Sequence, residues 1–219
     1  MNAITASSWP YPRWIAHRGA GKLAPENTLA AFRLGAQHGY RMFECDAKLS
    51  ADGVPFLLHD ATLERTTNGR GTGGDLPLGA LAQLDAGSWH SRAYAGEAVP
   101  TLEALARFCI ANGYFLNIEI KPTPGQEETT GRVVGETAAR LWQGQAVPPL
   151  FSSFKPDALA GAQAAAAHIP RALLLDTLWD GCLDTARRLG CVAIVCNHAL
   201  WDAALVAQVK GMGMRTLSY

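Results

Sequence analysis

The chain has 219 residues, of which 48% are hydrophobic and 17% are charged, so it can bury a sizeable core and lacks the composition of a disordered chain. Its 19 basic residues balance 19 acidic ones, which argues against non-specific nucleic-acid binding, because that depends on neutralising phosphates. No stretch approaches the ~20 apolar residues that span a bilayer, so no transmembrane segment is expected.

The N-terminus and the cysteines indicate the compartment. Residues 1–14 lack a charged segment followed by an apolar one, so we expect no secretory signal. The cysteines are odd in number and show no CxxC spacing, which favours reduced thiols in a cytoplasmic protein. They are Cys45, Cys109, Cys182, Cys191 and Cys196.

The first predicted elements are a strand and a helix. Residues 14–17 have the composition of a short strand, which ends at Arg18-Gly19. The tetrapeptide Pro25-Glu26-Asn27-Thr28 opens a helix with apolar residues at helical spacing, and Gly39 is a suitable stop.

A hairpin and an irregular stretch follow. Residues 42–49 predict a second strand, the turn at 51–53 reverses the chain, and 54–59 run back. The stretch 60–99 is rich in turn residues and has no long periodic segment. We interpret it as an insertion or a long functional loop after the second strand.

Regular alternation returns with a helix that Thr101 caps and Gly113 ends. No GxGxxG or GxxxxGK[ST] motif opens the helices that follow, which removes the main support for a nucleotide site. Strands alternating with helices of this length are typical of a parallel α/β sheet. The strands are expected at 114–121, 150–153, 171–175, 192–196 and 214–219, and the helices at 128–143, 156–167, 181–189 and 201–210.

The main strands number seven, whereas a closed parallel barrel needs eight. Tyr219 ends the chain inside a predicted strand. We therefore expect a single TIM-barrel domain over 1–219, with the insertion 60–99 inside it. This barrel would lack its last helix–strand–helix portion, through truncation or a damaged reading frame. A complete open sheet of seven strands is the alternative.

Polar and apolar residues alternate on two of the predicted strands. Because side chains on a strand alternate between its faces, Glu44 and Asp46 point the same way. On the strand over 114–121, Glu119 and Lys121 share a face, and leucine or isoleucine occupies the opposite one. Helices covering the aliphatic faces would force the polar faces into the barrel centre, which brings Glu44, Asp46 and Glu119 together.

Three carboxylates in one dry cavity repel one another, each pair ~4 Å apart costing on the order of 4 kcal/mol at an effective dielectric near 20. One hard divalent cation removes that cost, so Glu44, Asp46 and Glu119 predict a site for Mg²⁺ or Ca²⁺. The absence of a Cys/His cluster at matching spacing argues against zinc. The alternative is a structural ion network, in which Glu44 or Asp46 pairs with Arg18 or Lys121.

Two histidines follow predicted strands that flank the carboxylates. His17 ends the first strand, and His59 ends the hairpin return. An imidazole that titrates near neutral pH suits proton transfer, so the two predict an acid/base pair. Arg18 and Lys121 supply the fixed positive charge that a phosphoryl group requires.

The ordered motifs resemble those of glycerophosphodiester phosphodiesterases. They are His17-Arg18-Gly19, Pro25-Glu26-Asn27-Thr28, Glu44-Cys45-Asp46, His59-Asp60 and Glu119-Ile120-Lys121, with Thr62-Leu63-Glu64-Arg65-Thr66-Thr67 and Ser152-Ser153-Phe154 between or after them. The likeness runs from about Trp14 to the last residue.

The resemblance implies a TIM barrel with a small insertion, and metal-dependent hydrolysis of glycerophosphodiesters to sn-glycerol 3-phosphate and an alcohol. It implies Glu44, Asp46 and Glu119 as ligands of one Mg²⁺ or Ca²⁺ ion, and His17 and His59 as the acid and the base. Arg18 and Lys121 match phosphate-binding positions. Asn27 would orient the first loop or touch the site, and Tyr219 matches an aromatic residue that faces the substrate.

Two other functions stay open at this point. One is a barrel that binds phosphodiesters without catalysis. The other is a metal-dependent barrel lyase or aldolase, in which Lys121 forms a Schiff base. The expected partner is a small glycerophosphodiester and no nucleic acid; the sequence indicates neither the head group nor the oligomeric state.

Overall fold

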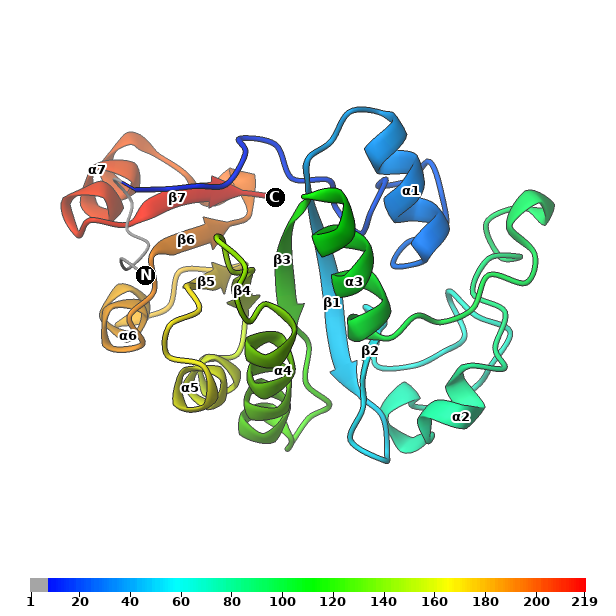
Figure 1. Cartoon of the computed structure of the whole chain (residues 1–219). Coiled ribbons are helices and arrows are strands. Elements are labelled where there is room, and N and C mark those ends of the chain that lie inside the picture. Colours follow the sequence, from blue (N-terminus) through cyan, green and yellow to red (C-terminus); the bar gives the residue numbers. More distant parts are fainter. Residues whose placement is uncertain (1–7) are drawn as a thin grey trace.

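Residues 8–219 are described by a computed structural model, whose strands form one seven-stranded sheet in the order β2-β1-β3-β4-β5-β6-β7 (Figure 1). Strand β2 is antiparallel to β1, and every other neighbouring pair is parallel. No hydrogen bonds join the edge strands β2 and β7 to each other within residues 8–219. The strands are β1 (Met42–Leu49), β2 (Pro55–Leu57), β3 (Phe115–Ile120), β4 (Leu150–Ser153), β5 (Arg171–Leu175), β6 (Ala193–Cys196) and β7 (Arg215–Ser218).

The helices connect the parallel strands and cover the outer face of the sheet (Figure 1). Their starts follow the predicted caps: the Thr28 hydroxyl accepts from the Ala31 N–H, and the Thr101 hydroxyl from the Ala104 N–H. The long helices are α1 (Leu29–Gln37), α3 (Leu102–Asn112), α4 (Glu127–Leu141), α5 (Pro156–Ala165), α6 (Cys182–Arg188) and α7 (Ala203–Gly211), and a 3₁₀ turn (His198–Leu200) precedes α7.

The first predicted strand is the one element that the structure corrects. Residues 14–17 make a single parallel bridge, between Ala16 and Phe43, instead of a regular strand. The reason is the turn that follows at once, where φ is +52° at Arg18 and +100° at Gly19. The edge of β1 that a longer strand would occupy is also partly taken by β2.

Residues 60–99 form an irregular segment that lies beyond β2, at the right of Figure 1. It contains one short helix, α2 (Leu78–Leu81), and two 3₁₀ turns (Gly73–Asp75 and Arg92–Tyr94). It packs on a small core of its own, which consists of Phe56, Leu58, Leu63, Leu81, Ala86 and Val99.

The interior of the curved sheet changes character along the strands. Near the amino ends it is apolar, built by Met42, Leu150, Ala172 and Ala193. Tyr11 closes this end by donating from its hydroxyl to the Pro148 carbonyl at 3.0 Å. Toward the carboxyl ends the interior carries buried charged side chains. The fold thereby gathers the polar residues at one end of the strands.

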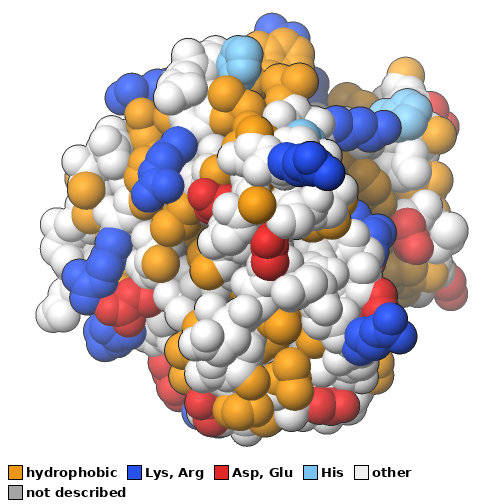
Figure 2. Space-filling view, turned by 90° about the vertical axis from the view of Figure 1, so that its right-hand side faces the viewer, with side chains coloured by type: hydrophobic (Ala, Val, Ile, Leu, Met, Phe, Trp, Pro, Cys, Tyr) orange, Lys and Arg blue, Asp and Glu red, His pale blue; other side chains and the backbone are white. Residues whose placement is uncertain are grey.

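Charged side chains of both signs are scattered among hydrophobic ones on the face drawn in Figure 2. Within residues 8–219, every helix falls short of the length and hydrophobicity that crossing a bilayer requires. All five cysteines are buried and free. The secretory-signal expectation concerns a stretch whose first seven residues lie outside the described part.

Candidate active site

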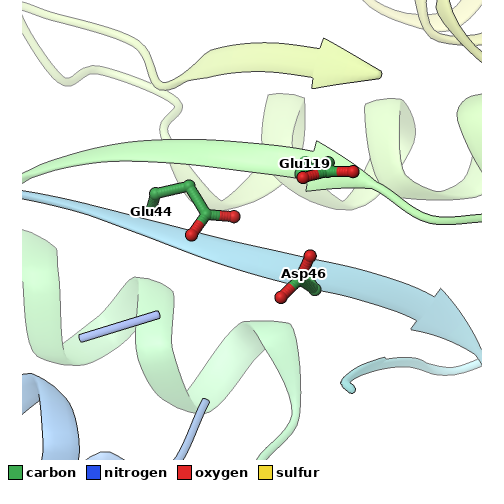
Figure 3. Close-up of side chains that lie close together, drawn as sticks. All are labelled: Glu44, Asp46 and Glu119. Atoms are coloured by element: carbon green, nitrogen blue, oxygen red, sulfur yellow. The ribbon is translucent and has the colours of Figure 1, made fainter. Parts of the chain in front are cut away.

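Three buried carboxylates lie together between β1 and β3. In the parallel register Asp46 is paired with Glu119, and Glu44 lies one step back on the same face of β1. One oxygen of each carboxylate falls within 4.8 Å of the other two. Figure 3 shows Glu44 and Asp46 on β1 lying close to Glu119 on the neighbouring strand β3. The alternation of side chains along the pleat brings them together.

The electrostatics of this cluster are unfavourable to three ionised groups. Burial raises the pKa of Glu44 well above its usual range, and the negative charges of Asp46 and Glu119 raise it further. Burial, followed by Asp46, raises the pKa of Glu119 to about 7. Glu44 Oε1 and Asp46 Oδ1 are buried without a hydrogen-bond partner among the described residues. Such atoms are costly unless a ligand reaches them.

The cluster fits a hard divalent cation. Its donors are all oxygens, as Mg²⁺ and Ca²⁺ prefer, and the two unpartnered oxygens are available for coordination. One cation would offset the repulsion that raises these pKa values. Glu44, Asp46 and Glu119 are therefore the residues that would hold it.

The loop between Ala16 and α1 is held directly against the carboxylates. The backbone N–H of Arg18 donates to Glu44 Oε2 at 2.9 Å, and its side-chain Nε lies 3.2 Å from Asp46 Oδ2. Asn27 donates from Nδ2 to Asp46 Oδ2 at 2.8 Å and accepts the Asp46 N–H on Oδ1. Arg18 and Asn27 both have positive φ, a sparsely populated conformation that functional loops often use.

Gly19 lets this loop pack closely on α1. With φ at +100°, a Cβ atom at position 19 would lie 2.8 Å from the backbone of Ala31. Only glycine accepts both that conformation and that approach. The glycine of His17-Arg18-Gly19 therefore allows the loop beside the carboxylates to pack directly on α1.

His17 lies at the edge of the cluster, with Nε2 3.8 Å from Glu44 Oε2 and 60% of its side chain exposed. Partial desolvation, followed by Arg18, lowers its pKa. A lowered pKa leaves the ring mostly neutral at pH 7, so it can accept a proton.

His59 is held from both sides. Its Nδ1 lies 2.7 Å from Asp60 Oδ1, and its Nε2 lies 3.0 Å from the Lys121 ammonium. Because an ammonium only donates, these partners assign the proton to Nδ1 and a lone pair to Nε2. Partial burial, and then Lys121 and Arg18, lower the pKa of His59 against the opposing effect of Asp46 and Asp60.

Lys121 connects this histidine to the carboxylates and to the aromatic side of the site. Its Nζ lies 3.2 Å from Glu119 Oε1 and 5.7 Å from the ring centre of Phe154. The Phe154 ring in turn packs edge-on against Tyr219 at 5.9 Å. Tyr219, which is 47% exposed, therefore borders the same site.

Comparison with known proteins decides the family. The profile of the glycerophosphoryl diester phosphodiesterase family matches residues 17–219. The chain belongs to this family. Its fold is a TIM barrel, in keeping with the sequence expectation, although the seven strands described here are not closed by hydrogen bonds.

Several members of this phosphodiesterase family are similar to the chain. A phosphodiesterase of Oleispira antarctica, solved in complex with the product sn-glycerol-3-phosphate, is 36% identical at a TM-score of 0.90, over 99% of this chain and 87% of that one. A glycerophosphodiester phosphodiesterase of Caldanaerobacter subterraneus is 40% identical over 56% of this chain and 52% of its own length. YhdW of Bacillus subtilis, provisionally named as the same enzyme, is 46% identical over 56% and 51%. The chain thus covers about half the length of these curated relatives.

The carboxylate cluster also has a buried neighbour, Lys48, that the sequence analysis did not single out. Lys48 continues the face of Glu44 and Asp46, is 3% exposed and donates to the Lys121 carbonyl at 3.1 Å. Burial, followed by Lys121, lowers the pKa of Lys48 to about 8. The alternation that led to the carboxylates would have led to Lys48 as well, had it been followed two residues further.

Two other titratable residues, Cys45 and His90, lie outside the carboxylate cluster. Cys45 points away from the carboxylates into the core beneath the helices. His90 approaches the Lys22 carbonyl from residues 60–99, with Nε2 at 3.1 Å, and its ring is flanked by Trp89 and Tyr94. These three residues form an aromatic cluster within residues 60–99.

Proposed function

We propose that the chain is a metal-dependent phosphodiesterase that hydrolyses glycerophosphodiesters to sn-glycerol 3-phosphate and an alcohol. The observation that carries the proposal is the buried triad of Glu44, Asp46 and Glu119 with a histidine on each side. The similarity to the Oleispira antarctica enzyme, which was solved with sn-glycerol-3-phosphate, supports this choice of product.

The cationic side chains suit the binding of the phosphodiester. Arg18 and Lys121 both lie against the carboxylate cluster, at 3.2 Å from Asp46 and from Glu119 respectively. We assign them to the phosphoryl oxygens, whose charge they neutralise and whose orientation they fix. Asn27 positions Asp46, and Tyr219 with Phe154 offers an apolar wall to the glycerol carbons.

The divalent cation, Mg²⁺ or Ca²⁺, would be held by Glu44, Asp46 and Glu119. When bound, it supplies a Lewis acid that stabilises negative charge on the phosphoryl group. Its oxygen ligands give no preference between the two ions.

The two histidines are assigned to proton transfer. His59 presents a lone pair at Nε2, while Asp60 holds its Nδ1–H. His17 lies on the Glu44 side of the cluster and is open to solvent. One ring accepts the proton of the nucleophile, which is water or the glycerol 2-hydroxyl, as its oxygen bonds to phosphorus. The other ring donates a proton to the leaving alcohol oxygen as its bond to phosphorus breaks. If the 2-hydroxyl attacks, water then opens the cyclic phosphate to give sn-glycerol 3-phosphate.

The test is release of sn-glycerol 3-phosphate from glycerophosphocholine in the presence of Mg²⁺ or Ca²⁺. We expect His17→Ala and His59→Ala each to lower kcat by roughly 10²–10⁴-fold at unchanged thermal stability. His168→Ala, in the segment between α5 and β5, is the matched control. Wild-type rates in both site variants would exclude two-histidine catalysis. Absence of turnover together with binding of sn-glycerol 3-phosphate would instead indicate a non-catalytic binding protein.

We also propose a cytoplasmic location. The support is the set of five buried, unpaired cysteines, which fits a reducing compartment. Fractionation of the source cells with an antibody to the chain tests it, and recovery outside the cytoplasm would refute it.

A further inference from the structure

Arg65, in the irregular segment 60–99, makes an unusually complete set of bonds to two carboxylates. It donates from Nε and Nη2 to Asp60, at 2.6 and 3.0 Å, and from Nη1 and Nη2 to Glu26, at 2.8 and 2.7 Å. Both pairs are bidentate, which is the strongest geometry for a guanidinium. The proposed reaction assigns no role to this residue.

The two carboxylates that Arg65 joins each hold a different residue of the proposed active site. Asp60 Oδ1 lies 2.7 Å from His59 Nδ1. Glu26 Oε1 accepts from Arg18 Nη1 at 2.8 Å. Two chains of contacts therefore leave Arg65, one ending at the proposed proton-transfer group and the other at a proposed phosphate ligand.

Without Arg65, both carboxylates would lose their main cationic partner. Hydrogen bonds from Arg65 are the largest stabilising cause of the lowered pKa values of Asp60 and Glu26. Asp60 would then be free to rotate away from the His59 ring, and Glu26 would bind Arg18 alone. Residue 26 lies in the first loop and residue 60 after the hairpin, and the Arg65 side chain bonds to both.

We propose that Arg65 is a positioning residue, which sets the orientation of His59 through Asp60 and that of Arg18 through Glu26. This inference rests on the proposed function, because it assumes that His59 and Arg18 act in hydrolysis. The planar guanidinium donates two hydrogen bonds to each carboxylate from a rigid fork, which a lysine ammonium cannot do.

Loss of Arg65 is also expected to lower the free energy of unfolding, by a moderate amount. The side chains of Arg65, Asp60 and Glu26 are 44%, 27% and 13% exposed, and solvent weakens exposed ion pairs while a bidentate network retains part of its strength. A loss of activity well beyond any loss of stability therefore separates a positioning role from a structural one.

The experiment compares Arg65→Ala and Arg65→Lys with wild type, in turnover of glycerophosphocholine. We expect Arg65→Ala to lower kcat by about 10–100-fold, as removal of an orienting partner does, and Arg65→Lys to recover part of that loss. The matched control is Arg107→Ala, because Arg107 donates from Nε and Nη2 to Glu103 Oε1 on the surface of α3, away from the site, and its loss should leave kcat unchanged.

A double-mutant cycle tests the route through Asp60. If Arg65 acts on kcat partly through Asp60, then the loss in the double variant Arg65→Ala/Asp60→Asn should be smaller than the product of the two single losses, because residues that share a network are not additive. The loss that Arg65→Ala still adds to Asp60→Asn belongs to the route through Glu26. Fully multiplicative losses would overturn that route. A kcat within twofold of wild type in Arg65→Ala would overturn the proposal as a whole.

A measurement without substrate separates this inference from the proposed function. Nitrogen-15 NMR of His59 should show a single neutral tautomer with the proton on Nδ1 in wild type and in Arg107→Ala, and a mixture in Arg65→Ala. An unchanged single tautomer in Arg65→Ala would contradict the positioning role. If the wild-type chain shows this tautomer but no turnover, the proposed function fails while the positioning role stands.

Discussion

The two ends of the barrel interior are built from the same strands and differ in chemistry. At the amino end, Met42 and Leu150 are buried in an apolar cluster, each no more than 1% exposed. At the carboxyl end, Asp46, Lys48 and Glu119 are buried with charges, and oxygens of the triad are left without partners. One end is packed for stability, and the other holds groups that destabilise the fold until a ligand arrives.

A single strand passes from an apolar to a charged environment within a few residues. Strand β1 goes from Met42 in the apolar cluster to Asp46 and Lys48 in the polar one, on a single face. At the carboxyl end, burial raises the pKa of Glu44 and Glu119 and lowers that of Lys48, so the charged forms of these groups destabilise the fold. Apolar packing at the amino end offsets this loss of folding free energy. Substitutions at the two ends should therefore have opposite consequences for activity and stability.

The largest expected effect is at the carboxyl end. Asp46→Asn removes a charge from the triad and weakens the contact with Arg18. We expect hydrolysis to fall by about 10³-fold, which corresponds to about 4 kcal/mol of lost transition-state stabilisation. Steady-state kinetics with glycerophosphocholine measures it, with the exposed Asp184→Asn as the control. Activity within tenfold of wild type would remove the triad from the mechanism.

The second effect belongs to the amino end. Leu150→Ala opens a cavity in the apolar cluster and should lower the free energy of unfolding by about 3 kcal/mol. Hydrolysis at temperatures well below the midpoint should stay within about twofold, because Leu150 lies outside the triad and its contacts. Urea denaturation and kinetics on the same sample give both values. A large loss of kcat with little loss of stability would contradict the assignment of the amino end to stability and of the carboxyl end to catalysis.

The third effect is a gain of stability at the carboxyl end. The pKa of Glu119 in the folded chain, about 7, is above its ordinary value of 4.5. Its carboxylate therefore destabilises the metal-free fold fully above pH 7, and this penalty disappears as the pH falls toward 4.5. Glu119→Gln should raise the metal-free free energy of unfolding by about 2 kcal/mol at pH 8 and by much less at pH 4.5.

Urea denaturation in EDTA at both pH values checks this difference. Glu136→Gln, on the exposed face of α4, is the control and should change little at either pH. A Glu119→Gln chain that is less stable than wild type at pH 8 would show that Glu119 stabilises the fold without an ion. That result would favour the structural ion network.

The smallest expected effect is again at the amino end. Tyr11→Phe removes the buried hydroxyl that donates to the Pro148 carbonyl at 3.0 Å. The loss should be about 1 kcal/mol in the free energy of unfolding, with no change in kcat. Tyr40→Phe, at an exposed position, serves as the control. No measurable loss would show that the hydroxyl contributes nothing to closing this end.

The alternation of residues along two strands predicted the meeting of Glu44, Asp46 and Glu119, because side chains alternate on every strand and these two strands are parallel neighbours. The same alternation places Lys48 on the face of Glu44 and Asp46. The sequence analysis passed over it because a single lysine at that position indicates no metal site or acid/base pair. The predicted strand over 14–17 was wrong in length, because the turn at Arg18 and Gly19 limits it to one bridge.

The links from Arg65 to Glu26 and Asp60 were beyond reach of the sequence. Arg65 and Glu26 lie 39 positions apart and meet only because residues 60–99 fold back on the first loop. Turn-rich sequence gives no periodicity from which such a contact can be inferred. The sequence showed the motif at 62–67 that contains Arg65, but the partners of Arg65 could be identified only from the tertiary structure.

The most direct test of the central claim is anomalous diffraction from crystals of the chain soaked in Mn²⁺, an ion that takes the same oxygen ligands as Mg²⁺. The carboxyl-end cluster predicts one anomalous peak at about 2.0–2.6 Å from an oxygen of each of Glu44, Asp46 and Glu119. A peak elsewhere, or none in a soak that saturates a known Mn²⁺ protein, would show that the three carboxylates form a structural ion network and not a metal site.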